Sequence, residues 1–511
     1  MTKSAVLIVG AGPTGLVHAL WLTKQGVTVR LIDKSSGPGE TSRAMAVQAR
    51  TLEFYRQLGM TDAVVATGYK TPAMNLWAQG KHKAQLQLVD AGQEISPYPF
   101  VLVFPQDRHE KFLVERLREL GVEVERRTEL LSFEDQGDHI EAVLKGPDGQ
   151  EETCTAAYLA GCDGARSPVR HQMGSGFEGG TYRQLFYVAD VVASGVNPPE
   201  QAHIAFDQSE FLLVMYYGQA GQYRFIGTVR DERAEHPEKL SFEDVGHDAI
   251  NGLNIKVEKV NWFSTYRVHH RVTDHFRRGR AFLLGDAAHV HSPAGGQGMN
   301  TGILDAINLA WKFAAVLKGQ ASESLLDSYE AERQAFARKL VETTDRLFTF
   351  ATAEGGFADF VRGNIAPLFI SVAYKSEHLR EYLFRTISQT TLHYHESPLS
   401  AGKAGKVQGG DRLPWVPLPA ADNYAPLTDI GWQVHVYGEA SADLPAWCIR
   451  HGVSLHVFNW QQAHEHAGLA KHAAYLLRPD TYVALADPTG SPAVLDRYLS
   501  GHGLTLTDQV H

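Results

Sequence analysis

The sequence predicts an α/β protein of more than one domain, and three observations support this fold class. The chain has 511 residues, which is longer than a single hydrophobic core usually allows. Residues 4–34 follow the pattern of a buried strand, a glycine-rich turn, a helix and a second strand. Residues 181–271 instead alternate apolar and polar side chains and are rich in aromatics, which is typical of an antiparallel or mixed sheet.

Composition and charge exclude several classes of protein. The chain is 44% apolar and 21% charged, and its net charge of −10 is spread without runs of like charge, so we expect no nucleic-acid partner. No stretch reaches about 18 consecutive apolar residues, so we expect no membrane partner. The three cysteines, Cys154, Cys162 and Cys448, form no CxxC pair, which favours a cytoplasmic location and argues against disulfides or zinc.

A glycine-rich turn follows the first predicted strand, Ala5–Val9. Gly10, Gly12 and Gly15 form a GxGxxG motif, which provides a tight bend, a close backbone approach to a pyrophosphate, and close helix–strand packing. The second predicted strand ends on Asp33, whose carboxylate can accept hydrogen bonds from a ribose diol. The predicted binding residues of this Rossmann-type unit are Gly10, Gly12, Pro13, Thr14, Gly15, Asp33 and Lys34.

The same residues restrict the identity of the dinucleotide. An acid at position 33 disfavours a 2′-phosphate, so the ligand is FAD or NAD rather than NADP. A second GxGxxG match, at residues 174–179, lies between a helix-like and a strand-like segment. That order is wrong for a nucleotide-binding unit, so we interpret this match as an ordinary turn.

Residues 285–317, GDAAHVHSPAGGQGMNTGILDAINLAWKFAAVL, contain a carboxylate, a loop of small residues and an expected amphipathic helix. An NAD-dependent dehydrogenase needs no second cofactor loop so far along the chain, whereas the longer FAD does. We therefore predict non-covalently bound FAD. His289 and His291 could bind a metal, but no third ligand cluster lies nearby in the sequence, and we predict no metal site.

Three motifs occur in order along the chain: GAGPTG from Gly10, GCDGARSPVR from Gly161, and the GDAAH motif from Gly285. Weaker matches are SRAMAVQARTLEFYRQLG from Ser42, FPQDRHEKFLVERL from Phe104, and YLLRPDTYVAL near the C-terminus. Together these motifs resemble the single-component FAD-dependent aromatic hydroxylases of the para-hydroxybenzoate hydroxylase type. The resemblance covers nearly the whole chain.

The resemblance implies a Rossmann-type FAD-binding domain with an interleaved β-sheet substrate domain and a C-terminal thioredoxin-like α/β domain. The FAD-binding domain and its helical linker would comprise residues 1–72, 101–180 and 276–395. The substrate domain would comprise 73–100 and 181–275, and the thioredoxin-like domain 396–511. Because Cys448 is the only cysteine of the last segment, we expect a structural role there rather than dithiol chemistry, and a homodimer is consistent with this role.

The resemblance also assigns cofactor-binding residues. Asp286 would bind the ribityl hydroxyls, and the loop from Pro293 to Asn300 would surround the flavin. Backbone N–H groups around Gly298–Asn300 would face the flavin N1/O2 edge, where negative charge accumulates on reduction. The remaining implied residues are Arg43 at the pyrophosphate, Gln106 at the ribityl chain, Asp163 with Arg166 in the second motif, and Gly296, Gly298, Met299 and Asn300 in the third.

Simpler structural roles are open for three of these residues. Arg43 could be a solvated residue at a helix cap, and Gln106 could cap the helix that follows it. Asp163 could serve the turn of its own DGARS motif.

The substrate residues are predicted from the hairpin expected within FLLVMYYGQAGQYRFIGTV. Met215, Tyr217 and Arg224 are the pocket candidates, although the sequence pattern of each is also that of an ordinary sheet core, which any single residue here fits better. Pro293 and Tyr217 are the residues expected nearest the chemistry. A base or proton relay near a phenolic hydroxyl is also expected, with His203, Tyr216 and Tyr217 as candidates. The segment VNWFSTYRV lacks the WxWxIP motif of flavin halogenases, which argues against halogenation.

The activity implied by the resemblance is monooxygenation. NADPH or NADH would bind transiently and reduce FAD, and O2 would then form a C4a-hydroperoxyflavin that hydroxylates an electron-rich aromatic substrate. Phenolic and polyketide-like substrates are both open, as is Baeyer–Villiger oxygenation. Two other classes remain: a flavin reductase or dehydrogenase that does not activate O2, and a non-catalytic binder of FAD or an aromatic ligand.

Overall fold

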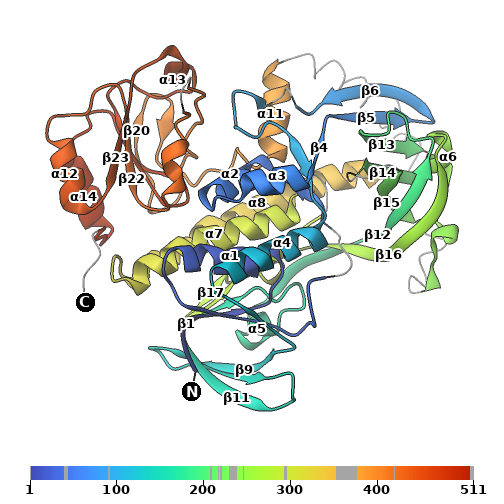
Figure 1. Cartoon of the computed structure of the whole chain (residues 1–511), viewed down its shortest axis with the longest axis horizontal. Helices are drawn as coiled ribbons and strands as arrows, with labels where there is room; N and C mark the ends of the chain where they lie inside the picture. The colour runs from blue at the N-terminus through green and yellow to red at the C-terminus, as the bar shows by residue number, and fades with distance from the viewer. Residues whose placement is uncertain are drawn as a thin grey trace.

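The protein is described here by a computed structural model (Figure 1). The residues that it describes are 2–39, 44–89, 92–207, 210–216, 218, 221–229, 239–245, 247–292, 296–352, 377–418 and 421–506. Three β-sheet bodies surround a central set of helices, with the C-terminal body on one side and the second sheet on the opposite side (Figure 1). Within these ranges, no helix is both long and apolar enough to span a membrane.

The first sheet has eight strands, in the order β17-β18-β11-β1-β2-β8, with β10 and β9 paired beyond β11. Five of its strands, from β18 to β8 in this order, are parallel, as expected for strands covered on both faces. The strands are β1 (Thr2–Val9), β2 (Val29–Asp33), β8 (Val124–Arg126), β9 (Glu129–Asp135), β10 (Ile140–Lys145), β11 (Glu151–Gly161), β17 (Arg277–Arg278) and β18 (Ala281–Leu283).

Helices α1, α4 and α7 form a layer on this sheet (Figure 1). The helices around it are α1 (Pro13–Lys24), α4 (Gln106–Glu119), α5 (Pro168–Gln172) and α7 (Gly298–Leu317). Helix α1 starts at a proline, whose fixed φ suits the first helical position, and it is followed by Gly26 at φ +76°. The expectation that α7 is amphipathic is wrong: every residue from Asn300 to Ala315 is buried, because other parts of the chain cover its outer face.

The second sheet is also eight-stranded, in the order β19-β16-β12-β15-β14-β13-β5-β6. Strands β5 and β6 come from the early part of the chain, between strands that belong to other sheets. The strands are β5 (Ala73–Ala78), β6 (Lys81–Gln87), β12 (Phe177–Ser194), β13 (Ala202–Asp207), β14 (Glu210–Tyr216), β15 (Gln222–Val229), β16 (Lys256–Thr273) and β19 (His289–Val290). Helix α6 (Asp248–Gly252) and the 3-10 helix η4 (Phe242–Asp244) pack their apolar side chains on one face of it.

The second GxGxxG match lies between α5 and β12, and its last residues already belong to β12. This segment is a turn that continues into a strand. Near the centre of the molecule, a small sheet contains β3 (Ala46–Val47), β4 (Tyr69–Thr71) and β7 (Val101–Val103). The neighbouring helices are α2 (Ala49–Gln57), α3 (Thr61–Thr67), η7 (Glu323–Leu326), α8 (Asp327–Thr352) and α11 (Glu377–Ile387).

The C-terminal body contains a six-stranded sheet in the order β21-β20-β25-β24-β22-β23. The Gly-, Pro- and Lys-rich stretch after residue 396 contributes β20 and β21 to this sheet. The elements are β20 (Ala401–Ala404), β21 (Val407–Gln408), η9 (Ala425–Thr428), β22 (Gln433–Tyr437), α12 (Leu444–His451), β23 (Ser454–Phe458), α13 (Gln462–His466), β24 (Ala474–Leu477), β25 (Val483–Asp487) and α14 (Pro492–Gly501).

Candidate active site

The three glycines of the first turn are required for different structural reasons. Gly10 has a φ of +103°, and a Cβ atom there would collide with the Cys162 carbonyl. A Cβ atom at Gly15 would collide with the Gly10 carbonyl, so both glycines are required by packing. Gly12 differs, because no atom lies within 4 Å of the position that its Cβ would occupy. The turn therefore leaves space at the N-terminus of α1, where backbone N–H groups favour an anion.

Asp33 lies beside this space, at the end of β2. Its Oδ2 accepts a 2.7 Å hydrogen bond from the Ala11 N–H, and its Oδ1 accepts one of 2.7 Å from the Ser35 N–H. The side chain is 16% exposed, so its carboxylate also reaches solvent. Lys34 is exposed. The Asp33 carboxylate is thus a partly exposed hydrogen-bond acceptor beside the Gly12 turn.

The third motif packs directly against the first. Gly285 and Gly302 both face Thr14: a Cβ atom at Gly285 would lie 2.7 Å from Thr14 Oγ1, and one at Gly302 would collide with it. The second motif joins them, because Arg170 Nη1 donates a 2.9 Å hydrogen bond to the Ala287 carbonyl. Three segments that are distant in sequence thus converge at the N-terminus of α1.

Asp286 is exposed at this junction, in the 3-10 helix η5 (Gly285–Ala287). Asp305 of α7, which is fully buried, holds the loop that carries it. Asp305 accepts hydrogen bonds from the Gly285 N–H (2.9 Å), His289 Nε2 (2.7 Å) and Arg333 Nε (2.6 Å). Burial alone would raise the pKa of Asp305, but the charges of Arg333 and His289 outweigh burial and lower it.

Sequence reasoning missed Asp305, although a lone acid among the apolar residues of ILDAINLAW was a visible signal.

The two histidines of the HxH pair form hydrogen bonds to protein groups. His289 bonds Asp305, and His291 Nδ1 donates to the Ser292 carbonyl at 2.9 Å. The described part of the chain contains no cluster of three or more side chains suited to a metal ion.

The first turn of α7 is held by the side chain of Asn300, which is fully buried. Its Oδ1 accepts hydrogen bonds from the Gln48 N–H (2.9 Å) and Thr51 Oγ1 (2.8 Å), and its Nδ2 donates to the Ala46 and Gly296 carbonyls. The Asn300 side chain therefore serves the protein, and only its backbone can serve a cofactor. Gly298 and Met299 begin the helix and are half-buried.

Gln106 and Asp163 border the same region. Gln106 is the first residue of α4 and donates a 2.8 Å hydrogen bond to Glu110; it does not cap the helix, whose N-cap is Pro105. Asp163 Oδ2 accepts from the Val169 N–H at 3.0 Å. Its Oδ1 is buried and has no hydrogen-bond partner in the described part of the chain, and burial raises the pKa of the carboxyl. An orphaned buried acceptor here fits a polar ligand.

Three predicted residues, Arg43, Tyr217 and Pro293, lie outside the described residues. The other two pocket candidates are brought together, since Met215 pairs with Arg224 across β14 and β15. They lie on the face of the second sheet opposite α6. Arg224 is 3% exposed and makes two hydrogen bonds to Asp190, of 2.7 and 2.6 Å. Its Nη1 is buried without a partner in the described part of the chain.

Two relay candidates lie on the other face of this sheet. His203 Nδ1 accepts a 3.2 Å hydrogen bond from Trp77, and its Nε2 donates one of 2.8 Å to the Pro198 carbonyl. Burial lowers the pKa of His203, and both of its ring nitrogens have hydrogen-bond partners. Tyr216 packs edge-on against Tyr69 on the same face. Both ring nitrogens of His203 are therefore bound by protein groups, on the sheet face opposite to Arg224.

The geometry defines a class of protein: a dinucleotide-binding α/β domain whose cofactor space is bordered by two remote loops and adjoins a separate sheet. The sequence model of a family described as an FAD binding domain matches residues 3–344. The chain belongs to this family of flavin-dependent enzymes, and FAD is its cofactor. The residues around the Gly12 space suit the cofactor, since they supply an unobstructed helix N-terminus, a carboxylate at the end of β2 and a further exposed carboxylate in η5.

The chain is also similar to individual proteins that are named as monooxygenases or hydroxylases. The chain is 37% identical over 413 residues to 6-methylpretetramide 4-monooxygenase from Streptomyces rimosus, covering 79% of this chain and 72% of the relative. It is 29% identical to pentachlorophenol 4-monooxygenase from Sphingobium chlorophenolicum, over 80% of this chain and 75% of that one. Among solved structures, anhydrotetracycline hydroxylase from Streptomyces rimosus matches with a TM-score of 0.78, 26% identity, and coverage of 99% and 100%.

Proposed function

We propose that this flavoenzyme uses NADH or NADPH and O2 to hydroxylate an electron-rich aromatic substrate of the phenolic or polyketide type. The observation that carries the proposal is the convergence of three remote motifs at one cofactor space, joined by β19 and β16 to a separate sheet. The relatives support the reaction class, since the names of 6-methylpretetramide 4-monooxygenase and pentachlorophenol 4-monooxygenase both describe monooxygenases of ring compounds.

The chain's own residues have distinct tasks in this proposal. Gly12 leaves the N-terminus of α1 open to the pyrophosphate, and Asp33 accepts hydrogen bonds from the adenosine ribose. Asp286, with its loop fixed by Asp305, binds the ribityl hydroxyls. Backbone N–H groups of Gly298–Asn300 stabilise negative charge at the N1/O2 edge of the flavin. Bound FAD supplies the redox chemistry and the activation of O2.

The substrate face is the side of the second sheet that carries Met215 and Arg224. On this face Leu213, Met215 and Ile226 are only half-buried, which leaves apolar surface for a ring system. Asp190 fixes the Arg224 guanidinium by two bonds, and the buried Nη1 remains to donate to a substrate oxygen. Tyr217 lies two residues after Met215 in the sequence and remains a predicted pocket residue near the chemistry.

The domain division given above is also a proposal, supported by the membership of β5 and β6 in the second sheet. We likewise propose a thioredoxin-like C-terminal domain, with the order β25-β24-β22-β23 and the helices between these strands as support. Its Cys448 is buried and its pKa is raised to about 11 by burial, which favours a redox-inert domain. The three free cysteines support a cytoplasmic location.

A screen tests the proposal. The holoenzyme is mixed with NADH or NADPH and a panel of phenols, naphthols and polycyclic phenols, and nicotinamide oxidation is followed. A true substrate should stimulate oxidation and yield a product one oxygen heavier. Arg224→Gln should raise KM for that substrate while FAD content stays unchanged. Stimulated oxidation with a reduced rather than oxygenated product would instead establish a reductase and contradict the proposal.

A further inference from the structure

A turn of the C-terminal body inserts against the central helices, and we call residues Arg478–Tyr482 the docking turn. Arg478 makes two hydrogen bonds, of 2.6 and 3.0 Å, to Glu332 of α8. The Asp480 carboxylate accepts a 3.0 Å bond from Trp311 of α7. The Asp480 carbonyl and Thr481 Oγ1 accept bonds of 3.1 and 2.9 Å from Arg50 of α2. One short turn therefore binds three helices.

Thr481 is held in an unfavourable backbone conformation. Its φ is +64°, in the left-handed region that a β-branched residue rarely adopts. The hydroxyl of this residue is the acceptor for Arg50, and Thr481 is only 3% exposed. Local strain of this kind persists only where the surrounding contacts over-determine it. The contact between Thr481 and Arg50 is thus a defined feature of the domain interface.

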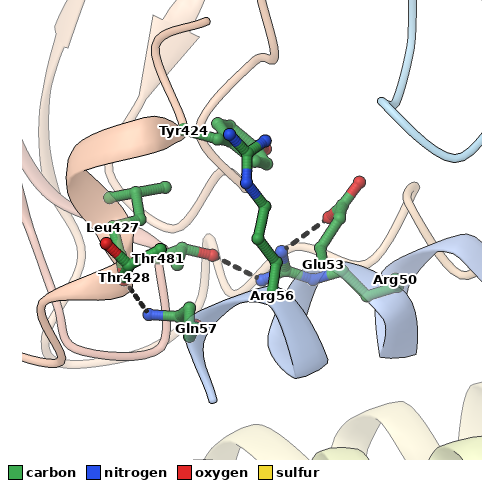
Figure 2. A pocket seen from close by; sticks show the side chains of 8 residues that line it. All are labelled: Arg50, Glu53, Arg56, Gln57, Tyr424, Leu427, Thr428 and Thr481. Atoms are coloured by element: carbon green, nitrogen blue, oxygen red, sulfur yellow. Dashed lines mark hydrogen bonds and ion pairs between the residues drawn. The ribbon is translucent and has the colours of Figure 1, made fainter. Parts of the chain in front are cut away.

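Arg50 also belongs to a buried charge cluster, of which Figure 2 shows Arg50 and Glu53. Arg50 is completely buried and bonds Glu53 at 2.9 Å. Glu53 also accepts two bonds from Arg412 of the C-terminal body, of 2.9 and 2.5 Å, and one of 2.6 Å from Ser96. Burial favours the neutral form of Glu53, but Arg412 and Arg50 outweigh burial and lower its pKa. Removing one partner would leave an uncompensated buried charge.

Helix α2 connects this cluster to the first turn of α7. Thr51, the residue after Arg50, donates through its hydroxyl to Asn300, and the Gln48 N–H donates to the same oxygen. Asn300 lies in the turn of α7 whose backbone N–H groups we have placed at the flavin. The contacts therefore run from the docking turn through Arg50 and the start of α2 to the flavin-facing turn.

We infer that Arg50 is a positioning residue for the flavin-facing turn of α7, and that the docking turn of the C-terminal body sets its position. The C-terminal body is then part of the scaffold of the flavin site rather than an independent module. The inference rests on the proposed placement of the α7 N-terminus at the flavin. Arg50 acts through Asn300 and touches no reacting atom.

Four variants of the full-length holoenzyme test this inference. Thr481→Val removes the acceptor for Arg50 and keeps the branched side chain, whereas Thr481→Ser keeps the hydroxyl. Arg50→Gln removes the charge itself. Arg56→Gln is the matched control, because Arg56 makes two bonds of 2.7 and 2.9 Å to Asp422 of the same C-terminal body, but from the far end of α2.

The first readout is amide hydrogen exchange of residues 296–305. Thr481→Val and Arg50→Gln should accelerate exchange there by about tenfold or more, the effect expected from losing one hydrogen bond to a charged group. Thr481→Ser and Arg56→Gln should change it by less than about twofold. Unchanged exchange of this segment in both Thr481→Val and Arg50→Gln, with only a lower Tm, would overturn the inference and leave a purely structural interface.

The second readout is the flavin itself. The FAD dissociation constant and the FAD reduction potential should shift in Thr481→Val and Arg50→Gln, and recover in Thr481→Ser. Faster exchange with both flavin properties unchanged would overturn the inference, because the turn would then not act on the flavin. Failure of the proposed function is distinguishable, since it would appear in the wild-type enzyme as a substrate screen without an oxygenated product.

Discussion

Replacing Gly12 with alanine should lower the affinity for FAD without lowering the stability of the apoprotein. Gly12 has φ −77° and ψ −178°, which any residue adopts, and its Cβ position has no neighbour within 4 Å. The free energy of unfolding of the apoprotein should therefore stay unchanged or rise by about 0.4–1 kcal/mol. The new methyl group occupies the space of the pyrophosphate. Losing one charge-assisted hydrogen bond costs about 1.5–3 kcal/mol, so FAD affinity should fall at least about tenfold.

The assay combines thermal unfolding of the apoprotein with an FAD titration followed by flavin fluorescence. Gly15→Ala is the contrasting variant, because its Cβ would collide with the Gly10 carbonyl and should destabilise the apoprotein itself. A Gly12→Ala protein that binds FAD as tightly as the wild type would refute the assigned role of Gly12. A lower apoprotein Tm in the same variant would refute the packing argument.

Three further predictions follow from the same geometry. Asp286→Ala should weaken FAD retention by about 1.5–3 kcal/mol in equilibrium dialysis, and full occupancy after gel filtration would contradict the ribityl assignment. Cys448→Ser should leave turnover and FAD content unchanged, because one buried thiol cannot form a disulfide within its domain; a large loss of turnover would reveal a role for the thiol. The pKa values of Glu53, Asp305 and Glu332 are lowered in the folded state, because the neighbouring cationic groups outweigh burial. Their contribution to stability should be present above about pH 5 and be lost as pH falls below the ordinary carboxyl range, which urea unfolding at several pH values measures.

Much of the cofactor half could be predicted from local sequence. The GxGxxG turn, its flanking strands and Asp33 form one contiguous unit, so periodicity and spacing define it. The hairpin of β14 and β15 was equally local, and the structure then pairs two of its pocket candidates, Met215 and Arg224. These features depend on residues close together in the chain.

The parts that were missed depend on contacts between remote segments. Helix α7 was expected to be amphipathic, but segments remote in the sequence cover it, for example the docking turn at Trp311. His203 was one of three relay candidates from the sequence, and only the fold shows that Trp77 and Pro198 bind its two ring nitrogens. The Asn300 side chain likewise forms hydrogen bonds to residues about 250 positions earlier in the chain.

The proposed reaction transfers an oxygen atom from O2 to an aromatic substrate, and isotope labelling follows that atom into the product. The holoenzyme, with NADH or NADPH and the substrate that most stimulates nicotinamide oxidation, is incubated under 18O2 in ordinary water, and in parallel under ordinary O2 in 18O-labelled water. We expect a hydroxylated product that carries one 18O atom in the first reaction and none in the second. A product without 18O from the gas, or one that is only reduced, would contradict it.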